Sequence, residues 1–187
     1  SYAAYADVNS NPSELNVYTI HDIGKSSNPY GSDFQGSAGA GGNVYFQNFD
    51  LNALGNPTPS NPYSLYSNGN VNYNSGNIKG GIDARGNVNL SSVTVNGPIN
   101  AGGNLSGQNG TINGNVKLGG NNSSSITING SVQTGASYTP SFNSSSISNY
   151  FLNTSSTWKN QAPTVSVTNN FGQLVLGTLQ AGQNIVK

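Results

Sequence analysis

Charged side chains are scarce in this chain of 187 residues, at 6% of the total. A typical soluble domain carries about 25%. The six acidic and six basic residues cancel, so the formal net charge is zero. The sequence therefore has neither the basic footprint of a nucleic-acid-binding domain nor a polybasic patch for a membrane surface. Two copies repel each other little, and a low net charge favours association.

Cysteine is absent, and His21 is the only histidine. Without cysteine there is neither a disulfide framework nor a thiolate metal site. No apolar run reaches the length of about 18 residues that a membrane span requires. No signal peptide is evident, and the chain begins at Ser1 without a methionine, which fits a processed secreted protein or a shortened chain.

Aromatic residues argue against disorder, although glycine, serine and asparagine are abundant. The chain has ten tyrosines, six phenylalanines and one tryptophan. Disordered segments usually combine high charge with few aromatic residues. We therefore expect residues 1–187 to fold as a single domain.

A short pattern recurs four times between Asn77 and Gly135. The copies begin at Asn77, Thr94, Thr111 and Thr127, so the offsets are 17, 17 and 16 residues. A repeat of this length cannot enclose a core alone, and each copy must bury its apolar face against its neighbours. The repeat therefore predicts a solenoid, and we call each circuit of it a rung.

Alignment of the copies produces three columns. Two are aliphatic and are expected to point inward: Ile78, Val95, Ile112 and Ile128, and Ile82, Ile99, Val116 and Val132. The third is a corner asparagine ladder, each member preceded by glycine: Asn70, Asn87, Asn104 and Asn121. Glycine permits the positive φ of a tight corner, and stacked amides hydrogen-bond from rung to rung. We predict an all-β fold, a parallel β-helix with rungs of about 17 residues.

Outside the regular rungs the pattern predicts a set of flanking segments. In chain order, the expected segments are a polar arm (1–12), a first strand and first rung (14–44), a loop excursion (45–66), regular rungs (67–140), a helix (141–160) and C-terminal strands (163–187). Three prolines and the longer spacing between Asn43 and Asn70 predict the position of this excursion.

One flanking α-helix is predicted from helical spacing of apolar residues at Ile147, Tyr150, Phe151, Thr154 and Trp158. We expect it to lie against the flank of the β-helix. Two segments with strand composition follow, and we expect them to return beside the early strand 14–20 and close the domain.

The region from Glu14 to Val44 carries a family resemblance. A Leu-Asn-Val strand is followed by the turn Ser32–Gly36 and by the run Ala38–Val44, which reads Ala-Gly-Ala-Gly-Gly-Asn-Val. This succession resembles the choice-of-anchor A domain of bacterial surface proteins. The resemblance implies an extracellular β-helical domain normally followed by a cell-surface anchoring signal, and it supplies no catalytic residues. The chain ends at Lys187 without a sorting motif, hydrophobic tail or basic end.

Residues for catalysis or metal binding are few. His21 has only Asp22 as an adjacent acid, and no two acidic residues share a rung column, so we expect no enzymatic activity. Asp22 and Asp33 flank a loop, and with backbone carbonyls they fit a calcium site. The alternative for Asp33 is a turn residue that caps local amides. No other cofactor is expected.

Two groups of outward residues are candidates for binding. An outward ladder consists of Thr94, Thr111, Thr127, Asn96, Asn113 and Asn129. Such regular rows suit an ice-binding surface, although threonine also suits any exposed strand, and Asn77 and Lys79 interrupt the rows. The loop aromatics Tyr63, Tyr66 and Tyr73 are candidates for stacking on sugars or contacting protein.

These features predict a secreted structural or adhesive protein of the cell surface or extracellular matrix, such as a biofilm matrix, that assembles with itself into fibres or a layer. In this hypothesis Tyr2, Tyr5 and Val8 of the arm add as a strand to an open end of the next copy. The alternatives are an adhesin that binds surface polysaccharide or protein and has lost its anchor, and an ice-binding protein. A polysaccharide-acting enzyme is suggested only by analogy of fold.

Overall fold

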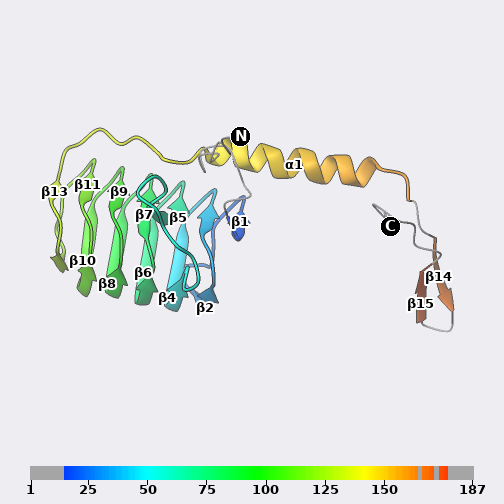
Figure 1. Ribbon diagram of the computed structural model, residues 1–187, viewed down its shortest axis with the longest axis horizontal. Helices are drawn as coiled ribbons and strands as arrows, with labels where there is room; N and C mark the ends of the chain where they lie inside the picture. Colours follow the sequence, from blue (N-terminus) through cyan, green and yellow to red (C-terminus); the bar gives the residue numbers. More distant parts are fainter. Residues whose placement is uncertain (1–14, 164–165, 171–172, 177–187) are drawn as a thin grey trace. The chain divides into compact units, whose positions relative to one another are not determined.

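The computed structural model describes residues 15–163, 166–170 and 173–176. The chain divides into two compact units, 1–148 and 149–187, where the sequence suggested one domain. The first unit is a β-solenoid built from parallel strands (Figure 1). The predicted parallel β-helix is thus confirmed, and each unit is described separately below.

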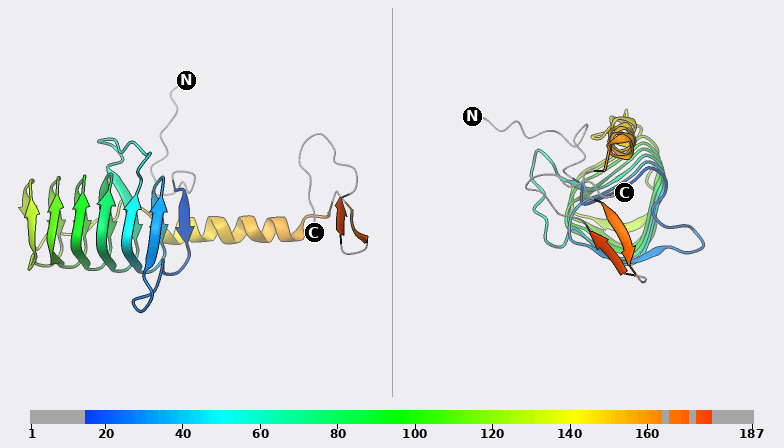
Figure 2. Two further views of the ribbon diagram at one scale, coloured as in Figure 1. Left: turned by 90° about the horizontal axis from the view of Figure 1, so that it is seen from below. Right: turned by 90° about the vertical axis from the view of Figure 1, so that its right-hand side faces the viewer.

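Along the chain, strands β1 to β13 alternate between two parallel sheets (Figure 2). The seven-stranded sheet contains, in spatial order, β1 (Val17–Thr19), β3 (Ala38–Ala40), β5 (Tyr63–Ser67), β7 (Gly81–Ala84), β9 (Ile99–Ala101), β11 (Val116–Leu118) and β13 (Val132–Gln133). The six-stranded sheet contains β2 (Tyr30–Phe34), β4 (Val44–Leu51), β6 (Val71–Ile78), β8 (Val88–Val95), β10 (Leu105–Ile112) and β12 (Ser125–Ile128).

The two aliphatic columns lie in register inside the solenoid. Val95 pairs with Ile78 on one side and Ile112 on the other, and Ile99 is likewise paired with Ile82 and Val116. These side chains are buried, as period-two alternation in a strand requires. In the early rungs the core is aromatic instead, with Phe46 stacked on Phe49 at a centroid distance of 4.1 Å.

A left-handed residue interrupts the long strands of the six-stranded sheet. It recurs once per rung, with φ between 51° and 62°, at Asn48, Ser75, Ser92 and Asn109. Two successive residues then lack an inward side chain, as at Gln47 and Asn48, and the strand turns a corner. We call the outward positions before this residue the first face and those after it the second face.

The loop excursion is shorter than predicted. Strands β4 and β5 occupy both ends of the expected 45–66 segment, which leaves only Asn52 to Pro62 outside the sheets. The prediction was wrong at these ends because the alternating inward side chains of β4 outweigh the nearby prolines. Buried Asn52 fixes the base of the excursion, since its side-chain amide donates to Ser64 Oγ at 2.7 Å and to the Lys79 carbonyl at 3.0 Å.

A strap formed by residues 134–143 crosses the outer side of the seven-stranded sheet, where regular rungs had been predicted as far as residue 140 (Figure 1). It runs from the last rung towards the first: Tyr138 and Ser141 bond to Asp83 on β7, and Phe142 packs on Tyr66 of β5. The strap therefore covers part of the outer side of this sheet.

The predicted helix is observed as α1 (Ser144–Asn160). Its first turn belongs to the solenoid unit: Ile147 is fully buried, and the Tyr18 hydroxyl donates to the Ser144 carbonyl at 3.0 Å. Farther along, Tyr150 and Trp158 are exposed. Of the apolar residues that predicted the helix, Ile147 is therefore the one buried in the solenoid unit.

The described C-terminal strands are β14 (Val167–Asn170) and β15 (Gln173–Leu176). They pair with each other in an antiparallel two-stranded sheet. Among the described strands, β1 pairs only with β3. The two late strands therefore form a hairpin with each other.

Candidate assembly and binding surfaces

The corner asparagine ladder is a continuous series of side-chain to backbone hydrogen bonds. Asn70 Oδ1 accepts from the backbone N–H of Asn87 at 2.8 Å, and the same bond joins Asn87 to Asn104 and Asn104 to Asn121. Sequence reasoning predicted amide-to-amide stacking at these positions. The backbone bond is favoured because it also satisfies a peptide donor at each corner.

The ladder extends two rungs beyond the predicted set. Asn43 Oδ1 accepts from the Asn70 N–H at 2.8 Å, and Asp22 Oδ1 accepts from the Asn43 N–H at 2.7 Å. Asp22 was considered for calcium, and in the structure its carboxylate begins the ladder. The repeat did not predict this role, because Asp22 and Asn43 are 21 residues apart rather than the 17 residues of a regular rung.

Glycine is required at this corner because the preceding rung lies too close to leave room for a side chain. None of Gly69, Gly86, Gly103 and Gly120 is among the residues with positive φ. A Cβ at Gly86 would instead collide with Asn70 Oδ1, and one at Gly103 would collide with Asn87 Oδ1. The predicted reason for these glycines was therefore wrong: a side chain there would displace the acceptor on which the ladder depends.

The last rung presents unpaired backbone groups. The Val116 N–H donates to the Ser131 carbonyl at 2.8 Å, so the N–H of the same trans peptide, on Val132, points away from the solenoid. The Asn129 N–H donates to the Ile112 carbonyl at 2.9 Å, so the Ile128 carbonyl also points away. Within the described residues, β12 and β13 each have a partner strand on one side only.

The sequence around this edge contains nothing that would block it. Residues 121–136 contain no charged side chain and no proline. Val132 is 45% exposed, although its column is buried in the rungs before it. Proteins usually blunt an edge strand with charge, proline or a covering segment. The last rung is thus an open edge available to another strand.

The second face carries the outward ladder. Thr111 is in register with Thr94 and Thr127, and Asp50 and Asn77 precede them in the same row. The Asn113 side-chain amide donates to Asn96 Oδ1 at 2.9 Å, and that of Asn129 donates to Asn113 Oδ1 at 2.8 Å. The asparagine row therefore bonds mainly to itself, and Lys79 occupies its position in the earlier rung.

The predicted loop aromatics are largely structural. Tyr66 is 1% exposed and Tyr73 is 2% exposed, while Tyr63 is half-buried. The Tyr73 hydroxyl donates to the Phe49 carbonyl at 2.7 Å inside the solenoid. The prediction that Tyr66 and Tyr73 are exposed was wrong, since both occupy positions where the fold buries the ring. The arm residues Tyr2, Tyr5 and Val8 lie outside the described residues.

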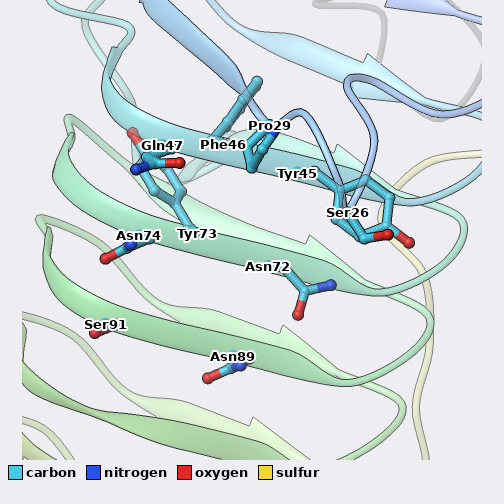
Figure 3. Close-up of a pocket in the computed structure, with 10 residues that line it drawn as sticks. All are labelled: Ser26, Pro29, Tyr45, Phe46, Gln47, Asn72, Tyr73, Asn74, Asn89 and Ser91. Carbon is cyan, nitrogen blue, oxygen red and sulfur yellow. The ribbon is translucent and has the colours of Figure 1, made fainter.

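A groove of about 430 Å³ lies on the first face (Figure 3). The loop with Ser26 and Pro29 stands beside it, and the outward residues of three adjacent rungs line it: Tyr45, Gln47, Asn72, Asn74, Asn89 and Ser91. None of its lining residues is charged. Sequence reasoning missed this groove because the loop that walls it belongs to no repeat.

Local geometry holds that loop over strand β4. Gly24 adopts φ 73°, and a Cβ there would lie 2.6 Å from the Tyr45 carbonyl oxygen. Lys25 and Asn28 close the loop with reciprocal backbone bonds of 3.2 and 3.0 Å. Gly24 thus allows the chain to pass close above β4, which places Pro29 at the edge of the groove.

Asp83 is a buried carboxylate on the outer side of β7. It accepts hydrogen bonds from the Asn100 side chain at 3.1 Å, the Tyr138 hydroxyl at 2.9 Å and the Ser141 N–H at 2.6 Å, and also from the Ser141 hydroxyl. Burial raises the pKa of Asp83, and these donors lower it by less. The sequence feature that could have indicated this role is a single acid in a column of otherwise non-acidic residues.

Two of the remaining acids are neighbours: Asp33 on β2 is paired in register with Asp50 on β4, so the expectation that no two acidic residues share a rung column was wrong. His21 is exposed, and Asp33 on β2 accepts from the neighbouring side chains of Ser32 and Gln35. In the described part of the chain, no three His, Cys, Asp or Glu side chains gather as metal ligands would, and no helix has the length and apolarity to cross a membrane.

No family model, curated protein sequence or solved structure matches this chain. Three surfaces of the solenoid unit are candidates for function: the open last rung, the second face and the groove.

Proposed function

We propose that this protein is a structural component of a cell surface or extracellular matrix that assembles with copies of itself by strand addition. The observation that carries the proposal is the open edge of the last rung. The Val132 N–H and the Ile128 carbonyl point out of the solenoid, and no charge or proline in residues 121–136 protects them. The secreted location is supported by the resemblance of residues 14–44 to a family of bacterial surface domains.

The first rung offers the complementary edge. The Gly41 N–H donates to the Thr19 carbonyl, so the N–H of the Thr19–Ile20 peptide points the other way. The Ile23 N–H donates to the Asn43 carbonyl, so the Asp22 carbonyl also points outward. A second copy that continues both parallel sheets would pair donors with acceptors at this joint.

Such a joint is head-to-tail, because the last rung of one copy meets the first rung, or the arm, of the next. A head-to-tail contact that does not close into a ring propagates into a fibre. The zero net charge of the chain removes the long-range repulsion that would otherwise oppose stacking.

The test uses Val132→Pro in the full chain. Proline removes the outward N–H and leaves the bond between Val116 and Ser131 intact, so assembly should be lost while the thermal unfolding midpoint changes little. Val132→Ala is the matched control, since it shortens the side chain and keeps the N–H. Electron microscopy and sedimentation velocity report the outcome.

We expect filaments or large oligomers from the wild type and from Val132→Ala, and monomers from Val132→Pro. A wild type that stays monomeric at high concentration contradicts the proposal, as do unchanged filaments from Val132→Pro. Deleting residues 1–11 then identifies the donor: loss of filaments assigns the added strand to the arm, and retention assigns it to the first rung.

A further inference from the structure

The amides that line the groove differ from the other asparagine columns of the solenoid. The corner ladder and the Asn96 column are hydrogen-bonded from rung to rung. In contrast, the side chains of Gln47, Asn72, Asn74 and Asn89 form no hydrogen bond within the described residues. These are the polar groups on this surface whose bonding capacity is left for a ligand or for water.

Their positions are fixed by strand register. Asn72 is paired with Tyr45 on one side and Asn89 on the other, and Asn74 is paired in the same way with Gln47 and Ser91. Two parallel rows of polar side chains therefore cross three rungs, at the strand spacing of about 4.8 Å. Because these residues lie on sheet strands, the rows are preorganised.

One end of the groove supplies apolar surface. Tyr45 is half-buried, and Pro29 stands beside strand β4 in the loop fixed by Gly24 (Figure 3). A tyrosine ring and a proline that line the same groove present C–H and π surface to a flat apolar ligand face. The site thus combines one apolar end with rows of amides that both donate and accept hydrogen bonds.

We propose that this groove binds a neutral glycan. A sugar ring presents hydroxyl groups, which both donate and accept, around an apolar C–H face, and the groove offers amides beside Tyr45. The absence of charge among the lining residues disfavours acidic polymers, since none of these residues is a cation that could offset desolvation of a carboxylate or sulfate. The proposal does not depend on self-assembly, because all lining residues belong to one copy.

The experiment is native affinity electrophoresis of the full chain in gels that contain one polysaccharide each. The neutral probes are β-glucan, xylan, mannan, galactan and dextran, and the acidic probes are polygalacturonate and alginate. The wild type and Val132→Pro are both run, because a monomeric variant removes any contribution of multivalency. We expect at least one neutral polymer, and neither acidic polymer, to retard both proteins.

Two groove variants and one matched control locate the site. Tyr45→Ala and Asn74→Ala should each weaken retardation at least about tenfold in the polysaccharide concentration required, which corresponds to about 1.4 kcal/mol. Gln108→Ala is the control: Gln108 is exposed, continues the row of Gln47, Asn74 and Ser91, and does not line the groove. It should bind as the wild type does.

Asn74 is exposed and makes no internal bond, so its variant tests the site even if Tyr45→Ala perturbs the fold. The proposal is overturned if no neutral polymer retards the protein, if acidic polymers retard it as strongly, or if Gln108→Ala loses as much binding as Asn74→Ala. Exclusive binding of a protein partner at this surface would appear as the first of these outcomes.

Discussion

The Ser141 N–H donates a 2.6 Å hydrogen bond to the carboxylate of Asp83, 58 residues earlier in the chain. This contact holds the strap to the middle of the seven-stranded sheet. Tyr138 bonds to the same carboxylate, and the side chain of Asn100 bonds both to it and to the Thr139 carbonyl. One buried acid thus fixes a segment that has no strand partner at this point.

Loss of this acid should loosen the strap. Asp83→Ala leaves several buried donors without an acceptor, and we expect the free energy of unfolding to fall by about 3 kcal/mol. Urea unfolding measures the loss, and amide hydrogen exchange should accelerate at Tyr138 to Ser141. Asp83→Asn, which retains one acceptor, should lose less. Unchanged exchange across the strap in Asp83→Ala would contradict this role.

The raised pKa of Asp83 predicts a pH dependence with a definite sign. Burial lifts the folded-state pKa above the ordinary value of 3.8, so the folded state binds this proton more tightly than the unfolded state does. The resulting stability is fully present below that value and is lost as the pH rises through the folded pKa. Burial also raises the pKa of Tyr138, which therefore stays a neutral donor.

Unfolding free energies of the wild type and Asp83→Asn, measured from about pH 3 to about pH 8, test this sign. The advantage of the wild type over Asp83→Asn should shrink as the pH increases, because the asparagine does not titrate. An advantage that grows with pH would mean that the hydrogen bonds outweigh burial.

The inward and outward positions of β10 predict opposite tolerance of charge. Ile112 is fully buried between Val95 and Ile128, so Ile112→Asp places an unpaired charge in an aliphatic column. We expect a loss of more than about 4 kcal/mol or failure to fold. Thr111→Asp, one residue earlier, should cost less than about 1 kcal/mol. Similar thermal midpoints for the two variants would refute the assignment.

The corner ladder should contribute measurably at each rung. Asn87→Ala removes the acceptor for the Asn104 N–H, and the expected loss is about 1 kcal/mol because water can reach this exposed corner. Asn89→Ala, two residues later on the same rung, removes no internal hydrogen bond and should change stability by less than about 0.5 kcal/mol. Equal losses of unfolding free energy in the two variants, measured by chemical unfolding, would show that the hydrogen bonds of the ladder do not stabilise the fold.

The second face should bind ice weakly. Threonine occupies only three rungs of the row, and the Asn96, Asn113 and Asn129 amides bond to one another. Thermal hysteresis should match that of an inert control protein and should not change in Thr111→Leu. A large hysteresis that disappears in Thr111→Leu would instead make ice binding the leading function.

The repeating part of the fold could be predicted because its information is periodic. Ile112 and its partners recur at an offset of about one rung, and parallel stacking places equal positions in contact. The same periodicity shows that Tyr73 is inward, since it pairs with Leu90 one rung later, but the nearby prolines obscured it. The contact between Asp83 and Ser141 and the loop that contains Pro29 occur once each, so the repeat does not predict them. The groove could not be predicted for the same reason, because it is formed by the periodic rows together with this single loop.

The strap also restricts how such a protein can change length during evolution. Duplication of one rung between Asp83 and the last strand would lengthen the stack by about 4.8 Å, which is more than one extended residue spans. Residues 134–141 would then no longer reach the carboxylate unless they gained length as well. A lineage that adds or removes rungs in this half must therefore change two separate segments together, whereas a lineage that keeps the strap keeps its rung number.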